Sequence, residues 1–168
     1  YAFSINEGAE EIVNYLKLGG ADYDYPCMDW YLIPKLLKKS YWSEPYYDTG
    51  GGNTIMSTYA LPLRNPQGEV YAIFTANISL SRFTDMVDKL KPYHSSYTFL
   101  LSRNGSFLTH PDREKIMNET IFSVALGKND VQEEEIGRNI LNGVTGTAQF
   151  NNAEQDSYAL YTAIPNCG

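Results

Sequence analysis

The sequence has few of the residues and motifs on which catalytic and metal sites depend. It contains 2 cysteines and 2 histidines. Cys27 and Cys167 form neither a Cys-x-x-Cys pair nor a zinc spacing, and the motifs of serine hydrolases, P-loop proteins and zinc proteases are absent. A triad of Ser102, His110 and Asp112 can be drawn, but no feature of the sequence exposes a nucleophile there. The sequence therefore predicts a protein that is not an enzyme and that uses no metal ion or cofactor.

Basic charge and long apolar runs are also scarce. The chain has 13 lysines and arginines against 20 aspartates and glutamates, which gives a formal net charge of -7. An acidic surface repels phosphate backbones, so the charge argues against nucleic-acid binding. No apolar run reaches the roughly 18 residues that span a bilayer, and no signal peptide is present. Because the chain starts at Tyr1 without a methionine, we expect it to be a segment of a longer protein.

Tyrosine, by contrast, is abundant, with 14 in 168 residues. Its ring is apolar and its tip polar, which suits half-buried sheet faces and ligand pockets. Two interpretations of the early aromatic residues remain open. They can pack a loop onto a sheet, or they can form a cage in which ring faces supply contact area and hydroxyls orient polar groups. The residues concerned are Tyr23, Trp30, Tyr31, Trp42, Tyr46 and Tyr47.

Two similar hairpins organise the chain. Residues 57–63 and 70–76 are β-prone runs separated by the turn Asn65-Pro66-Gln67-Gly68. Residues 146–150 and 157–164 repeat the pattern across a polar turn. Both match the composition of antiparallel strands joined by a tight connection. Two such hairpins, about ninety residues apart, predict two copies of one small α+β domain.

A helix is expected between the two copies. Leu80, Phe83, Val87 and Leu90 share one helical face, Ser79 or Ser81 can cap its start, and Pro92 stops it. The other expected elements follow from shorter patterns. In the first half they are a strand at 1–5, helices at 8–17 and 30–39, and a loop at 22–29. In the second half they are a hairpin, with strands at 97–102 and 106–110 around Asn104-Gly105, and helices at 114–118, 122–126 and 131–141.

Several segments, in their order and spacing, resemble the double Cache family of extracytoplasmic sensor domains from bacterial transmembrane receptors. They are Asp29-Trp30-Tyr31, the run from Trp42 to Asp48, the hairpin 58–63 with 70–80, the run 97–105 followed by His110-Pro111, and residues 164–168. The resemblance implies an α+β fold of two tandem PAS-like modules, each an antiparallel sheet with flanking helices. Residues 1–80 would be the membrane-distal module, 81–92 a connecting helix and 93–168 the membrane-proximal module.

The same resemblance implies a cellular context. Such domains lie in the periplasm or outside the cell, between two membrane helices, and here those helices and a long N-terminal helix would lie outside this segment. The distal module binds a small molecule. The signal passes to a histidine kinase, chemotaxis, cyclase or phosphatase output, and the full-length receptor can be a homodimer.

One subfamily binds amino acids through a tyrosine, an arginine two residues before the Trp-Tyr pair, a second tyrosine and an aspartate. Met28 stands in the arginine position here and Asn77 in the aspartate position. Arginine clamps a carboxylate and aspartate neutralises an ammonium, so each replacement removes a charge-assisted bond of about 1.5–3 kcal/mol. We therefore expect a neutral or weakly charged metabolite, or a cation held by aromatic rings, rather than a standard free amino acid. The expected ligand-binding residues are Tyr23, Met28, Trp30, Tyr31, Trp42, Tyr46 and Asn77.

Two other functions remain open at this point. One is a protein–protein interaction module without a small-molecule ligand, which a side-chain-filled distal cavity would favour. The other is a secreted enzyme, for which the sequence offers no constellation of catalytic groups.

Overall fold

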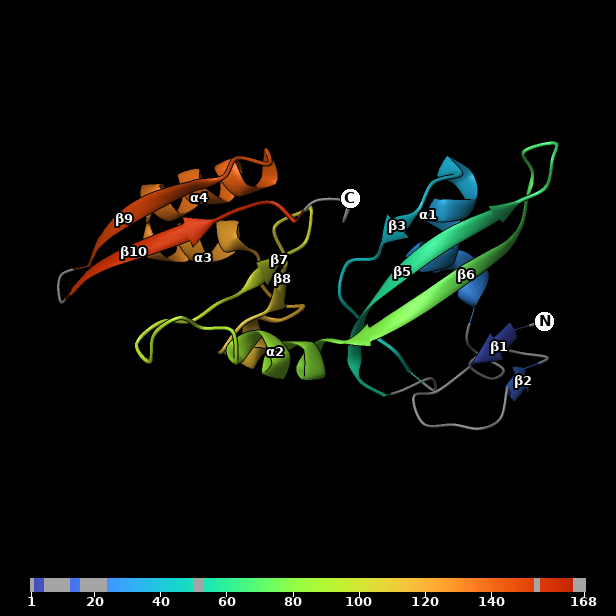
Figure 1. The fold of residues 1–168 in the computed structure, drawn as a ribbon, viewed down its shortest axis with the longest axis horizontal. Coiled ribbons are helices and arrows are strands. Elements are labelled where there is room, and N and C mark those ends of the chain that lie inside the picture. Colours follow the sequence, from blue (N-terminus) through green and yellow to red (C-terminus); the bar gives the residue numbers. More distant parts are fainter. Residues whose placement is uncertain (1, 5–12, 16–23, 50–52, 153–154, 165–168) are drawn as a thin grey trace.

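The elements of the chain form two groups joined by helix α2 (Leu80–Asp88), as Figure 1 shows. The computed structural model describes residues 2–4, 13–15, 24–49, 53–152 and 155–164. Every strand pair among them is antiparallel, and helices flank the sheets in both groups. The structure is therefore of the α+β class predicted from the sequence.

Strand β5 (Ile55–Arg64) is the centre of the first group. It pairs along its length with β6 (Val70–Ser79), and its other edge pairs with β3 (Tyr41–Trp42) and β4 (Tyr46–Tyr47). The β5–β6 turn is closed by Asn65, whose side-chain oxygen accepts hydrogen bonds from the amides of Gln67, at 3.1 Å, and Glu69, at 2.8 Å. Gly68 there has a φ of 81°, which favours glycine. The predicted first hairpin is confirmed.

One face of β5 is buried and supports helix α1 (Asp29–Leu37). The even-numbered residues Met56, Thr58, Ala60 and Pro62 are buried, and successive side chains of a strand point to opposite faces. α1 contacts β3, β5 and β6 and buries its own Trp30 and Pro34. Since α1 lies against the hairpin in Figure 1, we assign the even-numbered row to the face that α1 covers. The helix predicted at 30–39 is confirmed, although it ends at Leu37.

α2 follows β6 without a loop. Leu80 is 1 % exposed and Val87 5 %, as the predicted apolar face requires, but Leu90 is 72 % exposed because the helix ends at Asp88. The predicted serine cap is wrong. Ser79 occupies the N-cap position, but its side chain accepts no hydrogen bond from a helix amide. Its hydroxyl lies 3.0 Å from the Ser81 hydroxyl instead. An ion pair between Asp85 and Arg113 joins α2 to the second group.

The second group holds the later predicted elements. It contains β7 (Leu100–Leu101), β8 (Phe107–Thr109), α3 (Ile121–Lys128), α4 (Val131–Leu141), β9 (Gly146–Asn152) and β10 (Gln155–Tyr161). The β9–β10 hairpin and α4 are confirmed. The β7–β8 turn places Gly105 at a φ of 83°, as the Asn-Gly pair predicts. The helix predicted at 114–118 is reduced to one 3-10 turn, η2 (Arg113–Lys115).

The core of the second group lies between β8 and the helices. Phe107, Ile121 and Val124 are buried together, and Phe99 and Phe122 pack against them. Local capping fixes both helices. Thr120 forms a capping box with Ser123 at the start of α3, and Asp130 accepts hydrogen bonds from the amides of Gln132 and Glu133 at the start of α4. These caps satisfy amides that a helix start leaves without an internal partner.

One predicted helix is wrong. Residues 8–17 were expected to be helical, but β2 (Val13–Tyr15) is a strand that pairs antiparallel with β1 (Ala2–Ser4). The apolar spacing of a short segment does not decide between helix and strand, and here pairing with another part of the chain decides it. The other residues of that expected helix lie outside the described residues.

Two glycines in neighbouring helices provide a test of this packing. A Cβ on Gly137 in α4 would lie 2.8 Å from Cγ2 of the buried Ile121, whereas a Cβ on Gly127 in α3 would meet nothing within 4 Å. We expect Gly137→Ala to lower the free energy of unfolding by about 1–3 kcal/mol through overpacking. Gly127→Ala, the matched control, should raise it by about 0.5–1 kcal/mol through helix propensity. Urea denaturation measures the free energy of unfolding of both variants. If the two substitutions changed it in the same direction, the close contact between Gly137 and Ile121 would be contradicted.

A buried histidine provides a second test. Nδ1 of His110 accepts a hydrogen bond from the Asp112 amide at 2.9 Å, and the ring centroid lies 5.0 Å from that of Phe107. Burial, and then the charge of Lys115, lower the pKa of His110 below its ordinary value of 6.5. The folded state then binds fewer protons than the unfolded state, so stability is full above about pH 6.5 and is lost as the pH falls below it.

Chemical denaturation between about pH 7.5 and 5.5 checks this expectation. His110→Asn, which can keep the acceptor but does not titrate, should flatten the dependence in that range. His94→Gln is the control, because His94 is exposed. A pH dependence that follows His94 instead of His110 would contradict the assignment.

Candidate functional site

A chain of two hydrogen bonds crosses the buried face of the first sheet. The Tyr46 hydroxyl lies 2.7 Å from Oγ1 of Thr58, and Thr58 Oγ1 donates to Oδ1 of Asn77 at 3.0 Å. The three residues come from β4, β5 and β6, and Thr58 and Asn77 are direct cross-strand partners. The structure therefore brings together two of the predicted site residues, Tyr46 and Asn77, through a third residue that the sequence did not single out.

Thr58 is held in place by its surroundings. It is 0 % exposed. Its amide donates to Oγ of Ser43 at 2.9 Å, and its carbonyl accepts from the Ser43 amide at 2.9 Å. Ser57 Oγ in turn donates to the Ser43 carbonyl at 2.8 Å. These bonds hold the backbone of Thr58 in place, with its hydroxyl between Tyr46 and Asn77.

The aromatic residues do not form one cage in the part of the chain that is described. Trp30 and Tyr31 lie on α1 with ring centroids 6.0 Å apart, and Tyr25 contacts both rings from the preceding 3-10 turn, η1 (Tyr25–Cys27). Lys35 Nζ sits 5.1 Å from the Tyr31 ring centroid, a cation–π arrangement. This cluster belongs to the helix that covers the Tyr46–Thr58–Asn77 face.

Trp42 lies on the other face of the sheet. It is opposite Tyr59 in the strand register, and their ring centroids are 5.2 Å apart. Tyr46 is opposite Met56. The two pairings differ by one residue, so the segment between β3 and β4 shifts the register, and Trp42 and Tyr46 point to opposite faces. Met28 is half-buried at the N-cap of α1. Tyr23 lies outside the described residues.

The electrostatics near this face are acidic. Burial, and then the charges of Asp29 and Glu44, raise the pKa of Tyr41 above its ordinary value. Tyr41 is opposite Ala60 and so shares the face of Thr58. Oε2 of Glu44 is buried without a hydrogen-bond partner in the described part of the chain. Among the described residues, no cluster of three or more His, Cys, Asp or Glu side chains could hold a metal ion.

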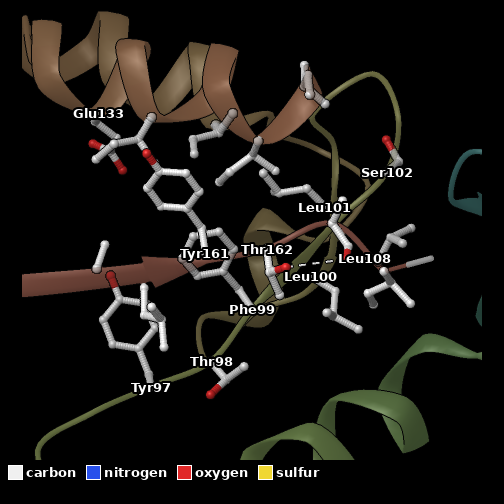
Figure 2. Close-up of a pocket in the computed structure, with 18 of the residues that line it drawn as sticks. Tyr97, Thr98, Phe99, Leu100, Leu101, Ser102, Leu108, Glu133, Tyr161 and Thr162 are labelled. Carbon is white, nitrogen blue, oxygen red and sulfur yellow. Dashed lines mark hydrogen bonds between the residues drawn. The ribbon is translucent and has the colours of Figure 1, made fainter. Parts of the chain in front are cut away.

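A groove lies where the two groups of elements meet: Tyr41, Trp42 and Ile78 of the first group line it together with residues of the second group. It is an open groove of about 2070 Å³, larger than the roughly 300–1,000 Å³ of a typical small-molecule pocket. Figure 2 shows Phe99 and Leu101 from the β7 segment facing Glu133 of α4 and Tyr161 of β10 across it. No motif in the sequence indicated this groove, because the residues that line it come from distant segments of the chain.

The hydroxyl of Thr58 allows a direct test of the hydrogen-bond chain. Thr58→Val keeps the shape but removes the acceptor of Tyr46 and the donor to Asn77, and we expect it to lower the free energy of unfolding by about 1–3 kcal/mol. Thr75→Val is the matched control, because Thr75 faces Ala60 in the same row of the sheet and should change stability by less than about 0.5 kcal/mol. Thermal unfolding measures the stability of both variants. If Thr58→Val destabilised the protein no more than Thr75→Val does, the hydrogen bonds of Thr58 to Tyr46 and Asn77 would be contradicted.

Known proteins resemble this chain in sequence and in fold. Residues 2–85 match the family model described as methyl-accepting chemotaxis protein-like, first PDC sensor domain. The methyl-accepting chemotaxis protein McpC of Bacillus subtilis is 27% identical over 134 residues, which cover 77% of this chain and 20% of that protein. The chain thus spans a fifth of the length of this curated relative.

Solved structures agree with the sequence match. The extracellular domain of the putative histidine kinase mmHK1S-Z3 superposes with a TM-score of 0.72 at 22% identity, over 95% of this chain and 55% of that one. The ligand-binding domain of the Pseudomonas aeruginosa chemoreceptor PctB, solved with L-Gln, gives a TM-score of 0.59 at 22% identity, over 82% and 50% of the two chains. The predicted double Cache resemblance is confirmed. The chain belongs to the methyl-accepting chemotaxis protein-like PDC family, the double Cache type of non-catalytic, extracytoplasmic sensor domain found in chemoreceptors and histidine kinases.

Proposed function

We propose that this domain senses a small molecule in its first group of elements, on the sheet face that α1 covers. The observation that carries the proposal is the Tyr46–Thr58–Asn77 hydrogen-bond chain, which lines up polar groups from three strands on that face. A pocket of this kind needs a few fixed polar groups among apolar and aromatic walls. Trp30 and Tyr31, whose rings contact one another on the helix that packs on β5 and β6, would supply such walls.

The domain division is part of the same proposal. Residues 1–80 form the ligand-binding, membrane-distal module, 81–92 the connecting helix and 93–168 the membrane-proximal module, both modules being PAS-like. In support of this division, α2 separates two groups of elements that have separate sheets and separate buried residues.

The ligand is proposed to be other than a standard free amino acid. Met28 has no charge with which to clamp a carboxylate, and Asn77 has none with which to neutralise an ammonium. The PctB domain was solved with L-Gln, so amino-acid binding occurs in this fold. A neutral or weakly charged metabolite, or a cation held by aromatic rings, suits the residues present here.

The domain is proposed to work within a longer membrane receptor. Within the residues that the structure describes, no helix combines the length and the apolar character needed to cross a membrane. Membrane anchoring would come from flanking helices, with a long N-terminal helix ahead of the first module. The output would be a kinase, chemotaxis or phosphatase module, and the full-length receptor can act as a homodimer.

An interaction module is the second candidate. The observation that favours it is the open groove lined by residues of both groups, which is larger than one small ligand needs and carries exposed apolar side chains such as Leu160, 82 % exposed. In that case the first group would bind no small molecule and the groove would contact a protein.

A thermal-shift screen of metabolites against the 168-residue chain separates the candidates. A ligand present at one hundred times its Kd stabilises the folded state by about 2.7 kcal/mol. Tyr46→Ala should abolish the shift, while Tyr71→Ala should not, because Tyr71 is 69 % exposed near the far end of β6. A shift that survives Tyr46→Ala would exclude the proposed site. Tight calorimetric binding of an ordinary amino acid, lost in Tyr46→Ala, would exclude the proposed ligand class.

A further inference from the structure

Three aromatic rings enclose the ring of His110. His110 is 9 % exposed, and its ring centroid lies 5.0 Å from that of Phe107, 5.7 Å from that of Tyr97 and 6.0 Å from that of Phe99. Close packing of this kind leaves a side chain little room to turn. The turn that follows is at the surface, because residues 111–114 are exposed. A change at the contact between the ring and this turn is therefore taken up by the turn.

The neutral ring of His110 accepts a hydrogen bond that the protonated ring cannot accept. An amide nitrogen always carries its hydrogen, so the 2.9 Å contact with the Asp112 amide requires Nδ1 to be the acceptor. The Asp112 carbonyl oxygen lies 3.2 Å from the same nitrogen. A protonated Nδ1 can donate to that carbonyl, but it then leaves the Asp112 amide without its acceptor and facing a second N–H. Protonation therefore exchanges the partner of the ring and shifts the backbone at Asp112.

This turn also carries the ion pair that joins the two groups of elements. Arg113 directly follows Asp112 and pairs with Asp85 of α2. The two side chains are 57 % and 61 % exposed, and an exposed ion pair is weak, so a small displacement of the backbone at Arg113 is enough to loosen it. Helix α2 begins directly after β6 and also contacts β8. A change at His110 therefore has a short route to the helix between the groups.

The charges around the ring decide the pH at which it is protonated. Burial, and then the charge of Lys115, lower the pKa of His110 below 6.5, whereas Asp112 and Glu119 oppose them. From α2, the carboxylate of Asp85 faces this turn and is paired with Arg113. The ring is thus neutral at pH 7 and gains its proton in the acidic range, below about pH 6.5.

We propose that His110 is an acid-sensitive switch between the second group of elements and α2: protonation of its ring moves the turn at residues 110–113 and weakens the ion pair of Arg113 with Asp85. The domain is extracytoplasmic, so it is exposed to the pH of its surroundings. It would respond to acidification through the same helix that connects the two groups. This inference goes beyond the proposed function and does not depend on it, because none of these residues belongs to the first sheet.

The test follows individual resonances of the 168-residue chain by NMR between about pH 7.5 and 5.0. We expect the His110 ring, the Asp112 amide, the Arg113 side chain and the α2 amides around Asp85 to shift together, with one midpoint below about pH 6.5. Aspartates with ordinary pKa values titrate near pH 4 and do not produce this midpoint.

Two variants separate the steps of the switch. His110→Asn can accept from the Asp112 amide but does not titrate, so the shifts of Arg113 and α2 with this midpoint should disappear. Asp85→Asn removes the charge that Arg113 pairs with, so His110 and Asp112 should still titrate while the α2 amides no longer follow them. His94→Gln is the control, because His94 is exposed, and it should leave all of these shifts in place.

Two results would overturn the inference. If the α2 amides stay unchanged while the His110 ring titrates, the ring alters only its own turn. If the α2 amides follow the same midpoint in Asp85→Asn or in His110→Asn, the change reaches α2 without the ion pair or starts from another group. The Asp85→Asn comparison is informative even if His110→Asn does not fold. Neither result bears on the ligand site, which the thermal-shift screen tests separately.

Discussion

The pairing of β5 on both of its edges is the constraint on which the first group depends. It fixes which residues of β3, β4 and β6 share a face with the buried row of β5. Within that row Thr58 is a polar residue between Met56 and Ala60, and all three are buried. A buried hydroxyl is tolerated only when it is hydrogen-bonded, and its partners come from both neighbouring strands. The register that builds the core therefore also assembles the candidate site.

Sequence reasoning succeeded where the signals were local. The hairpin turn at Asn65 and Gly68, and the helix that starts after Asp130, depend on residues that lie within four positions of one another. It failed at Val13–Tyr15, because these residues are fixed by pairing with β1 rather than by their own spacing. Non-local pairing of this kind has no signature in a short window.

The candidate site likewise contains residues that the sequence could predict and residues that only the structure reveals. Tyr46 and Asn77 could be proposed from a family resemblance, but Thr58 has the appearance of an ordinary β-branched strand residue. Its role emerges only from the register that sets it opposite Asn77. Trp42 illustrates the converse. Four positions from Tyr46, it should share a face with it in a regular strand, yet the one-residue shift between β3 and β4 sends it to the other side.

The position of Asn77 also links the site to the rest of the molecule. It precedes Leu80, the buried first residue of α2, by three positions on a continuous strand, and α2 is paired to the second group through Asp85 and Arg113. A ligand that contacts Asn77 acts on the end of β6, from which α2 begins without a loop. Such a ligand changes the balance between two arrangements of α2 only to the extent that it binds one of them more tightly.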